Sequence, residues 1–399
     1  MTPRLTTLLV DKKIGYWRLP CNRKFLTNVN DCLIIAQSIV QSQALSACPV
    51  AVTLKDIAQK SGLSVSIVSR VLNRKSEKYR ISAETERRVL KTARELNYRP
   101  NQLARGLRLK KTHTVGLIAP DLSNPFFSAI IKSAQSVAHQ FGYSLVVCDT
   151  DEDLQLEIEH VNLLQSKGVD GLIVLPVGQR SSHFEFLVRQ SVPLVIVDRV
   201  FDQLVTNTVV IDNRTGAREA VEHLIANGHR RIAIIQGLPG TYTSEGRVKG
   251  YLDACAAHGI PVDESLIVGK DFRKQNGYVE TKLLLGRRDR PTAIFAAGDL
   301  ITLGALEAIA EEGLDVPRDL SIVAFDDVES AEFFRCPITV VAQPKEMIGE
   351  VAVKLLIDQM KNPDKHEIRQ IVLQPDLIIR DSVAPVRQAS PREAMAESG

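Results

Sequence analysis

TLKDIAQKSGLSVSIVSRVLN, residues Thr53 to Asn73, carries the strongest local pattern in this chain. Thr53 and Asp56 have the spacing of a capping box, which begins a helix, and Gly62 ends that helix where a left-handed residue is needed. Ser64 then caps a second helix. Two helices around so short a turn predict a helix-turn-helix, whose second helix lies in the major groove of DNA. The side chains expected to face inward are Ile57, Ala58, Val68, Val71 and Leu72.

Charge is distributed unevenly along the chain and favours DNA binding over the alternative, an ordinary helical hairpin. The 399 residues include 50 Lys and Arg against 47 Asp and Glu, a net charge of +3. Residues 52–111 carry 16 basic and five acidic side chains, a net charge of +11, whereas residues 112–399 have a net charge of −12. A basic module attached to an acidic body predicts that only the module binds a polyanion.

The basic module continues beyond the second helix. Ser82 caps a third helix, which completes a helix-turn-helix domain over residues 52–99. Residues 100–113 follow as a hinge helix and linker, because Asn101 can cap one or two further turns. So short a helix is marginal alone in water, and Leu107 is an apolar side chain suited to wedge into a minor groove. A plain linker is the alternative interpretation.

From Thr114 to residue 384 the pattern changes to short apolar strands that alternate with amphipathic helices. This alternation predicts parallel sheets with helices on both faces, and the strands are too many for one sheet. We therefore expect a core, residues 114–384, made of two α/β subdomains with a cleft between them. The predicted strands are 115–119, 144–148, 171–175, 194–197, 209–211, 232–236, 293–295, 322–325 and 339–341, and the predicted helices are 127–141, 157–166, 215–226, 247–258 and 300–312.

The two ends of the chain lie outside these domains. Residues 1–51 form an N-terminal extension with one short apolar patch, Asp31–Ala47, which lies too far into the chain for a signal peptide. A disordered tail, a short packing helix, or a true translation start near Val50 or Val52 would each account for the extension. Residues 385–399 are polar and are expected to be disordered.

Several classes of site and function have no support in the sequence. The six cysteines include no C-x-x-C pair, so no metal site, disulfide framework or cofactor is predicted, and this usage fits the cytoplasm. No apolar run approaches a membrane span. The G-x-x-x-x-G-K-[ST], H-E-x-x-H and G-x-S-x-G motifs are missing, so an α/β enzyme is the less favoured hypothesis. Cys148 and Cys336 are expected to be buried core thiols, and His223 and His229 to be surface residues.

Over residues 52–384 the chain resembles the LacI/GalR family of bacterial transcription regulators. The resemblance implies an N-terminal all-α helix-turn-helix domain and a periplasmic-binding-protein-like (type I) core of two doubly wound parallel α/β subdomains. It also implies a homodimer or tetramer on palindromic double-stranded DNA, and residues 382–399 show no tetramerisation helix, which favours a dimer. A periplasmic binding protein would share the core but not the basic head. The motifs that carry the resemblance are residues 53–73, NYRPNQLARGLR (97–108), GLIAPDLSNPFF (116–127), KGVDGLIVLP (167–176), VDR (197–199), NGHRRIAIIQG (227–237), RPTAIFAAGD (290–299), VPRDLSIVAFDD (316–327) and QPKEMIGEVAVKLL (343–356).

The resemblance assigns DNA-contacting roles by position. Val65, Ser66 and Arg70 would lie nearest the base edges, where Arg70 could make a bidentate contact to guanine. Ile67 and Gly106 depart from the family's usual Thr and Ser, which puts one polar contact and the folding of the hinge in doubt. The other residues assigned to DNA are Thr53, Ser64, Ser69, Asn73, Asn101 and Leu107.

The resemblance also implies an effector site where the strands of the core end, since open α/β sheets bind ligands there. Carboxylates and guanidinium groups can hydrogen-bond vicinal hydroxyls, and phenylalanine rings can cover the apolar faces of a sugar. Phe126 or Phe127 as core, and Asp198 with Arg199 as an ion pair, are the structural alternatives. The residues assigned to the effector are Asp121, Asn124, Phe126, Phe127, Asp198, Arg199, Arg247, Phe272, Asp299, Asp326 and Gln343.

Together these features predict a cytoplasmic, sequence-specific transcription regulator. They favour a repressor of carbohydrate-related genes over an activator. A small sugar-like effector bound in the cleft would control it. A nucleoside or purine effector is the alternative hypothesis.

Overall fold

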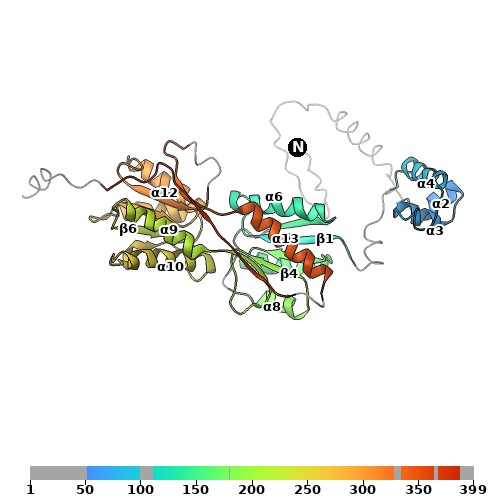
Figure 1. Cartoon of the computed structure of the whole chain (residues 1–399), viewed down its shortest axis with the longest axis horizontal. Coiled ribbons are helices and arrows are strands. Elements are labelled where there is room, and N and C mark those ends of the chain that lie inside the picture. The colour runs from blue at the N-terminus through green and yellow to red at the C-terminus, as the bar shows by residue number, and fades with distance from the viewer. Residues whose placement is uncertain (1–51, 99–110, 179, 328–333, 364–366, 387–399) are drawn as a thin grey trace, which may run out of the picture. The chain divides into compact units, whose positions relative to one another are not determined.

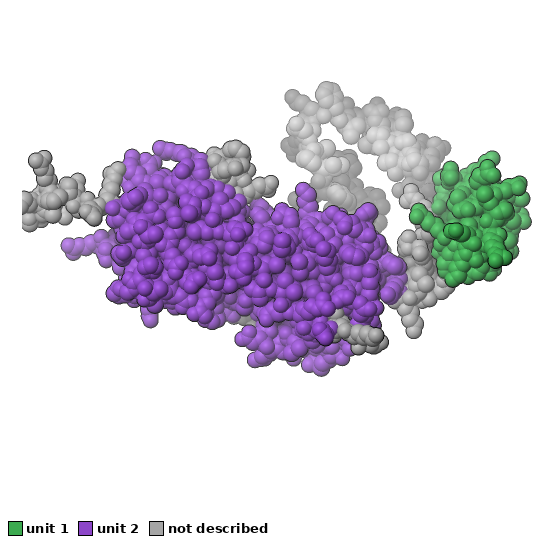
Figure 2. Space-filling model, viewed as in Figure 1, with its two compact units in different colours: residues 1–100 green, residues 101–399 purple. Residues whose placement is uncertain are grey.

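The computed structural model describes residues 52–98, 111–178, 180–327, 334–363 and 367–386. These residues group into two compact units, one on each side of Pro100, which Figure 2 colours green and purple.

Within residues 52–98 the first unit contains three helices, and each begins directly after a residue that the sequence predicted as a cap. The side chains of Ile57, Val68 and Val89 come one from each helix and are fully buried together. Leu72 is only partly buried, in contrast to the other four residues predicted to face inward. The helices are α2 (Leu54–Ser61), α3 (Val65–Leu72) and α4 (Ala83–Glu95).

The second unit begins with a parallel six-stranded sheet, in the order β11-β5-β4-β3-β1-β2, which forms the first subdomain (Figure 1). Helices α6 and α13 cover one face of this sheet, and α7 and α8 cover the other. The strands are β1 (Thr114–Ala119), β2 (Ser144–Asp149), β3 (Gly171–Val174), β4 (Leu194–Val197), β5 (Asn207–Ile211) and β11 (Gln370–Leu373), and the helices are α6 (Pro125–Gln140), α7 (Leu154–Ser166), α8 (Ser182–Arg189) and α13 (Lys345–Lys361).

The second subdomain repeats this architecture with the strand order β12-β10-β9-β8-β6-β7, in which only the β10–β12 pair among the described residues is antiparallel. Helices α9 and α10 cover one face and α11 and α12 the other. The strands are β6 (Ile232–Ile235), β7 (Ile267–Val268), β8 (Ala293–Ala296), β9 (Ser321–Phe325), β10 (Thr339–Ala342) and β12 (Asp376–Ile378), and the helices are α9 (Asn213–Ala226), α10 (Tyr242–Ala257), η1 (Glu264–Leu266), α11 (Lys274–Leu285) and α12 (Asp299–Glu311).

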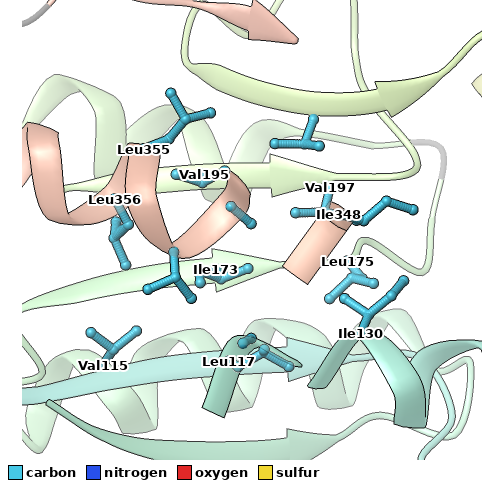
Figure 3. Close-up of a cluster of buried hydrophobic side chains, with 14 of the residues drawn as sticks. Val115, Leu117, Ile130, Ile173, Leu175, Val195, Val197, Ile348, Leu355 and Leu356 are labelled. Atoms are coloured by element: carbon cyan, nitrogen blue, oxygen red, sulfur yellow. The ribbon is translucent and has the colours of Figure 1, made fainter. Parts of the chain in front are cut away.

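Within the described part of the core, the chain passes between the subdomains three times, after β5, after β10 and after β11. The second passage brings α13 back onto the first sheet. Figure 3 shows Ile348, Leu355 and Leu356 of α13 beside the strand residues Ile173 and Val195. Because each subdomain contains segments from distant parts of the chain, neither one folds from a single continuous segment.

Helices α11 and α12 approach each other so closely that glycine is required on both. A Cβ atom at Gly277 would lie 2.0 Å from the carbonyl oxygen of Ile301. A Cβ atom at Gly304 would lie 2.0 Å from the carbonyl oxygen of Lys274. These distances are far below van der Waals contact, so the pair of glycines sets how closely the two backbones pack.

The predicted fold class is confirmed, and every predicted strand is present within two residues of its expected bounds. The predictions omitted β7, β11 and β12, which are short or alternate in burial, and the helices α8, α11 and α13. Helix α10 begins at Tyr242, five residues earlier than predicted. The predicted start was too late because residues 242–246 are largely polar and include Gly246. The domain boundaries remain predictions, since residues 1–51, 99–110 and 387–399 lie outside the described part.

Three predictions about burial were wrong. His229 is buried, 3% exposed, with one ring nitrogen 2.9 Å from Thr292 Oγ1 and the other 3.1 Å from the carbonyl oxygen of Ala384. Burial lowers the pKa of this histidine. Cys148 and Cys336 are only half-buried, and Cys148 packs at the edge of a hydrophobic cluster of the first subdomain.

Candidate functional site

Hydrogen bonds at the helix ends hold the helix-turn-helix together. The backbone amide and hydroxyl of Thr53 both donate to one carboxylate oxygen of Asp56, at 2.7 and 2.8 Å. Gly62 has a φ of +67° and ends α2, as the sequence predicted. Ser64 Oγ accepts from the amide of Ile67 at 3.3 Å and caps α3. The turn is therefore fixed by local bonds, which leaves one face of α3 available.

That exposed face carries most of the residues assigned to DNA. Arg70 is exposed, and Val65, a large apolar residue, is 41% exposed, as a contact with a thymine methyl would require. Asn73 donates from its side chain to the carbonyl oxygen of Ser69 at 2.6 Å, so both are half-buried at the end of the helix. Thr53, Ser64 and Ser66 are exposed, whereas Asn101 and Leu107 lie outside the described residues.

The second candidate site is a cleft between the two subdomains, at the carboxyl ends of the strands. The cleft encloses about 60 Å³ open to water-sized molecules, which is far below the roughly 300–1,000 Å³ of typical small-molecule pockets, so it is nearly closed. Every residue assigned to the effector lines it except Gln343. The lining residues are Asp121, Asn124, Phe126, Phe127, Asp151, Glu152, Asp198, Arg199, Thr243, Arg247, Phe272, Arg273, Asp299, Leu300 and Asp326.

Two of the carboxylates occupy equivalent places in the two sheets. Asp198 follows β4 and Asp326 follows β9, and both have left-handed backbones with φ of 68° and 74°. Their amides donate to Val209 and Val341 of the neighbouring strands, at 3.0 and 2.9 Å. A left-handed non-glycine residue is unfavourable, and such residues concentrate at functional sites, so the two strand ends are candidates for a binding role.

Arg247 is fixed in one orientation by contacts on all sides. It is 3% exposed, and its guanidinium donates to Asn213 Oδ1 at 2.9 Å and to the carbonyl oxygen of Ala297 at 3.0 Å. Its Nη1 lies 3.5 Å from Asp326, and the group lies over the ring of Phe325, 3.7 Å from the centroid. A guanidinium held so rigidly is preorganised to recognise a polar ligand.

Arg199 has a different partner from the one that the sequence suggested. It forms a bidentate pair with Glu152, at 2.8 and 2.9 Å, whereas Asp198 lies 3.9 Å away. It also donates to the carbonyl oxygens of Pro176 and Val177. The Asp198–Arg199 ion pair is therefore the weaker contact, and sequence analysis missed Glu152.

Three of the six carboxylates that line the cleft, Asp198, Asp299 and Asp326, are buried. Burial, and secondarily the negative charge of Asp326, raise the pKa of Asp299 to about 6. Burial also raises the pKa of Asp198. Asp299 accepts hydrogen bonds from the amide of Leu300 at 2.7 Å and from the side chain of Asn124 at 3.3 Å. The ionised form of Asp299 is thus disfavoured relative to that of an exposed aspartate.

The three phenylalanines lie around these charges. Phe126 and Phe127 pack edge to face, 5.1 Å apart, and belong both to the core of the first subdomain and to the cleft. A place in the core and a place in the lining of the cleft are therefore not exclusive for these two residues. Phe272 faces the guanidinium groups of Arg199 and Arg247, with the ring centroid 5.0 and 6.0 Å from them.

Two buried polar atoms in the cleft have no hydrogen-bond partner within the described structure. They are the hydroxyl oxygen of Thr243 and the Nε of Arg199, on side chains that are 1% and 4% exposed as residues. Buried polar groups are normally paired, so each indicates a place for a ligand or water atom. Gln343 instead lies behind the cleft and donates to the carboxylate of Asp326.

Sequence analysis missed Asp151, Glu152, Thr243, Arg273 and Leu300 among the lining residues. Asp151 and Glu152 follow β2, so the rule that strand ends form the site could have found them. Thr243 lies in the first turn of α10, which was predicted to begin later.

Two stretches of the chain match known protein families. Residues 53–101 match the family model for bacterial regulatory proteins of the lacI family, and residues 221–383 match a periplasmic binding protein-like domain. The HTH-type transcriptional regulator DegA of Bacillus subtilis (strain 168) is 37% identical over 339 residues, 84% of this chain and 98% of that protein. The chain belongs to the LacI family of DNA-binding transcription regulators.

Two further relatives are repressors by name. The HTH-type transcriptional repressor PurR of Photobacterium profundum is 32% identical over 333 residues, and the ribose operon repressor of Haemophilus influenzae 33% over 331, each covering 83% of this chain and 98% of the relative. A crystal structure of the lac repressor dimer bound to operator and the anti-inducer ONPF is 29% identical, with a TM-score of 0.74 over 84% of this chain and 99% of that one. Within the described residues of this LacI-family chain, we find no helix with the length and apolarity of a membrane span.

Proposed function

We propose that this LacI-family regulator is a cytoplasmic repressor that binds a palindromic operator as a homodimer, under the control of a neutral, polyhydroxylated effector in the cleft. The observation that carries the effector proposal is a pair of buried polar atoms without a hydrogen-bond partner, Thr243 Oγ1 and Arg199 Nε, on residues that line the same cleft as Asp299. A donor and acceptor set of this kind suits ligand hydroxyls, which both donate and accept.

The charge of the lining favours a neutral ligand. Six carboxylates line the cleft against three guanidinium groups, and Arg199 and Arg247 already face carboxylates. A phosphorylated or carboxylated effector would lack a free cation in the described lining other than Arg273 and would be repelled by the remaining acids. The carboxylates are Asp121, Asp151, Glu152, Asp198, Asp299 and Asp326.

The segment directly before β1 is bonded to the first subdomain. The backbone amides of Thr112 and His113, directly before β1, both donate to the carboxylate of Asp170 at 2.8 Å. The predicted hinge, residues 100–113, therefore ends on the first subdomain. An effector that changes the angle between the subdomains would move this attachment, with a coupling on the order of 1–3 kcal/mol.

A thermal-shift screen of the full chain tests the effector proposal. The panel contains neutral pentoses and hexoses, their phosphates, nucleosides and free purines, each measured against wild type and Asp299→Ala. A neutral sugar that raises the melting temperature of the wild type only would support the proposal, since binding to the native cleft stabilises by mass action. If instead a purine or nucleoside raises the melting temperature of the wild type only, the sugar proposal is wrong and the effector belongs to that class.

A further inference from the structure

The guanidinium of Arg70 lies on the ring of Tyr79, with its central carbon 4.1 Å from the ring centroid. Both side chains are on the surface, and Tyr79 is 43% exposed. Within residues 52–98 no carboxylate forms an ion pair with Arg70, and the two ion-paired residues described there are Lys60 and Glu95. Within residues 52–98, the ring of Tyr79 is thus the contact that orients the guanidinium of Arg70.

Tyr79 is held in place by the backbone of the segment between α3 and α4. The amide of Lys75 donates to the carbonyl oxygen of Arg70 at 2.9 Å, and the amide of Tyr79 donates to that of Lys75 at 3.2 Å. The amide of Ile81 donates to Ser76, whose side chain is buried. These bonds tie the tyrosine to the last turn of α3, so its ring stays beside Arg70.

We propose that Tyr79 is a positioning residue that presents Arg70 to the base edges and thereby contributes to sequence discrimination. The inference deepens the proposed function and rests on it, because it needs Arg70 to read a base. Stacking covers one face of the planar guanidinium and leaves its N–H edges free to donate to guanine in the plane. A free arginine would lose more side-chain freedom on binding than one already held by a ring.

Tyr79→Phe should retain the contact with Arg70 and Tyr79→Ala should lose it, because the face of the ring supplies the contact. We expect Tyr79→Ala to weaken binding by about threefold per half-site, or about tenfold over a palindrome, and to leave binding to non-specific DNA within about twofold. The tyrosine is largely exposed, so neither variant should lower the melting temperature appreciably. Lys78→Ala is the matched control in the same segment, because a lost phosphate contact weakens both kinds of binding equally.

The test is a selection with the full chain from duplexes with about 20 randomised base pairs, enough for two half-sites one helical turn apart. Wild type, Tyr79→Phe, Tyr79→Ala, Lys78→Ala and Arg70→Ala are compared, and affinities are then measured for the selected duplex and for poly(dI-dC). The inference predicts that Tyr79→Ala relaxes the same base pair in each half-site as Arg70→Ala, whereas Tyr79→Phe retains it.

The outcomes separate the inference from the proposed function. If the wild type enriches no sequence, sequence-specific DNA binding itself fails. If Arg70→Ala relaxes a base pair but Tyr79→Ala matches the wild type, the positioning role is overturned while the proposed function stands. Equal losses on the selected duplex and on poly(dI-dC) for Tyr79→Ala would also overturn it, because they indicate a general contact like that of Lys78.

Discussion

The side-chain amide of Asn124 donates to the carboxylate of Asp299 across the cleft, at 3.3 Å. Asn124 caps α6 in the first subdomain and accepts from the amide of Phe126, while Asp299 begins α12 in the second. The two subdomains thus contact each other through the residues that would meet an effector. Under the proposed function, a ligand that bonds to Asp299 would compete with this bond and so bias the angle between the subdomains.

The raised pKa of Asp299 predicts a stability that depends on pH. Its pKa is about 6 in the folded chain against a usual value of 3.8, so the folded state holds the proton more tightly. Stability due to this group is therefore greatest below about pH 4 and is lost as the pH rises through about 6. Asp299→Asn should stabilise the chain at pH 7.5 by on the order of 1–3 kcal/mol, and the gain should vanish near pH 4.

Thermal unfolding of both proteins between pH 4 and 8 measures this difference. Asp376→Asn, the same substitution at an exposed site outside the cleft, controls for the change in net charge. A constant difference between Asp299→Asn and wild type over the whole range would contradict the role of burial and of Asp326.

Effector affinity should depend on pH in the opposite sense. Hydroxyl groups of a neutral ligand would donate to the ionised carboxylate of Asp299, so the complex should favour the ionised form. Affinity is then expected to fall below about pH 6, by up to about tenfold per pH unit. Isothermal titration with the sugar identified by thermal shift measures this, and an affinity independent of pH between 5 and 8 would argue against a contact with Asp299.

Close packing between α11 and α12 predicts a sharp difference between two glycines. Alanine at Gly304 would place a Cβ 2.0 Å from the carbonyl oxygen of Lys274, so the helices must separate, at a cost of roughly 2 kcal/mol or more. Gly286 ends α11 with an ordinary φ of −74°, and a Cβ there would meet its first neighbour at 3.5 Å. Chemical denaturation should show a loss for Gly304→Ala and no loss for Gly286→Ala; equal stabilities would contradict the packing described here.

The proposed role of Arg70 predicts that its loss affects specific and non-specific DNA binding differently. Loss of a bidentate contact to guanine costs about 1–3 kcal/mol of discrimination per half-site, whereas the phosphate contacts of the basic module remain. Arg70→Ala should therefore weaken binding to the selected duplex far more than binding to poly(dI-dC) in a fluorescence anisotropy titration. Equal losses on both would show that Arg70 contacts only the backbone.

The sequence was most informative where one residue type serves one local purpose. Gly62 and Ser64 predicted the turn of the helix-turn-helix, and uninterrupted apolar runs predicted the central strands, because both follow from backbone chemistry and burial. The same reasoning placed Asp198 and Asp326 at strand ends. Their left-handed backbones, however, could not be predicted, since this conformation depends on hydrogen bonds to neighbouring strands.

Partnerships between distant residues were not accessible in the same way. Glu152 was missed because nothing near it in the sequence indicates that Arg199, 47 residues later, would pair with it. His229 was expected at the surface because it follows a helix end, yet the segment at Ala384 covers it. Helix α11 was missed because its apolar periodicity is weak. It also contains Gly277, which disfavours a helix by its own propensity but allows the close contact with α12.

The central claim, that the cleft controls DNA binding, is tested most directly by titrating the selected duplex with the full chain in the presence and absence of the stabilising sugar. We predict that the sugar changes the dissociation constant by roughly 5- to 150-fold, as a coupling of 1–3 kcal/mol requires. Arg247→Ala, which removes a rigid contact in the cleft, should abolish that change while the chain still binds the duplex. An unchanged dissociation constant for wild type at saturating sugar would contradict the claim.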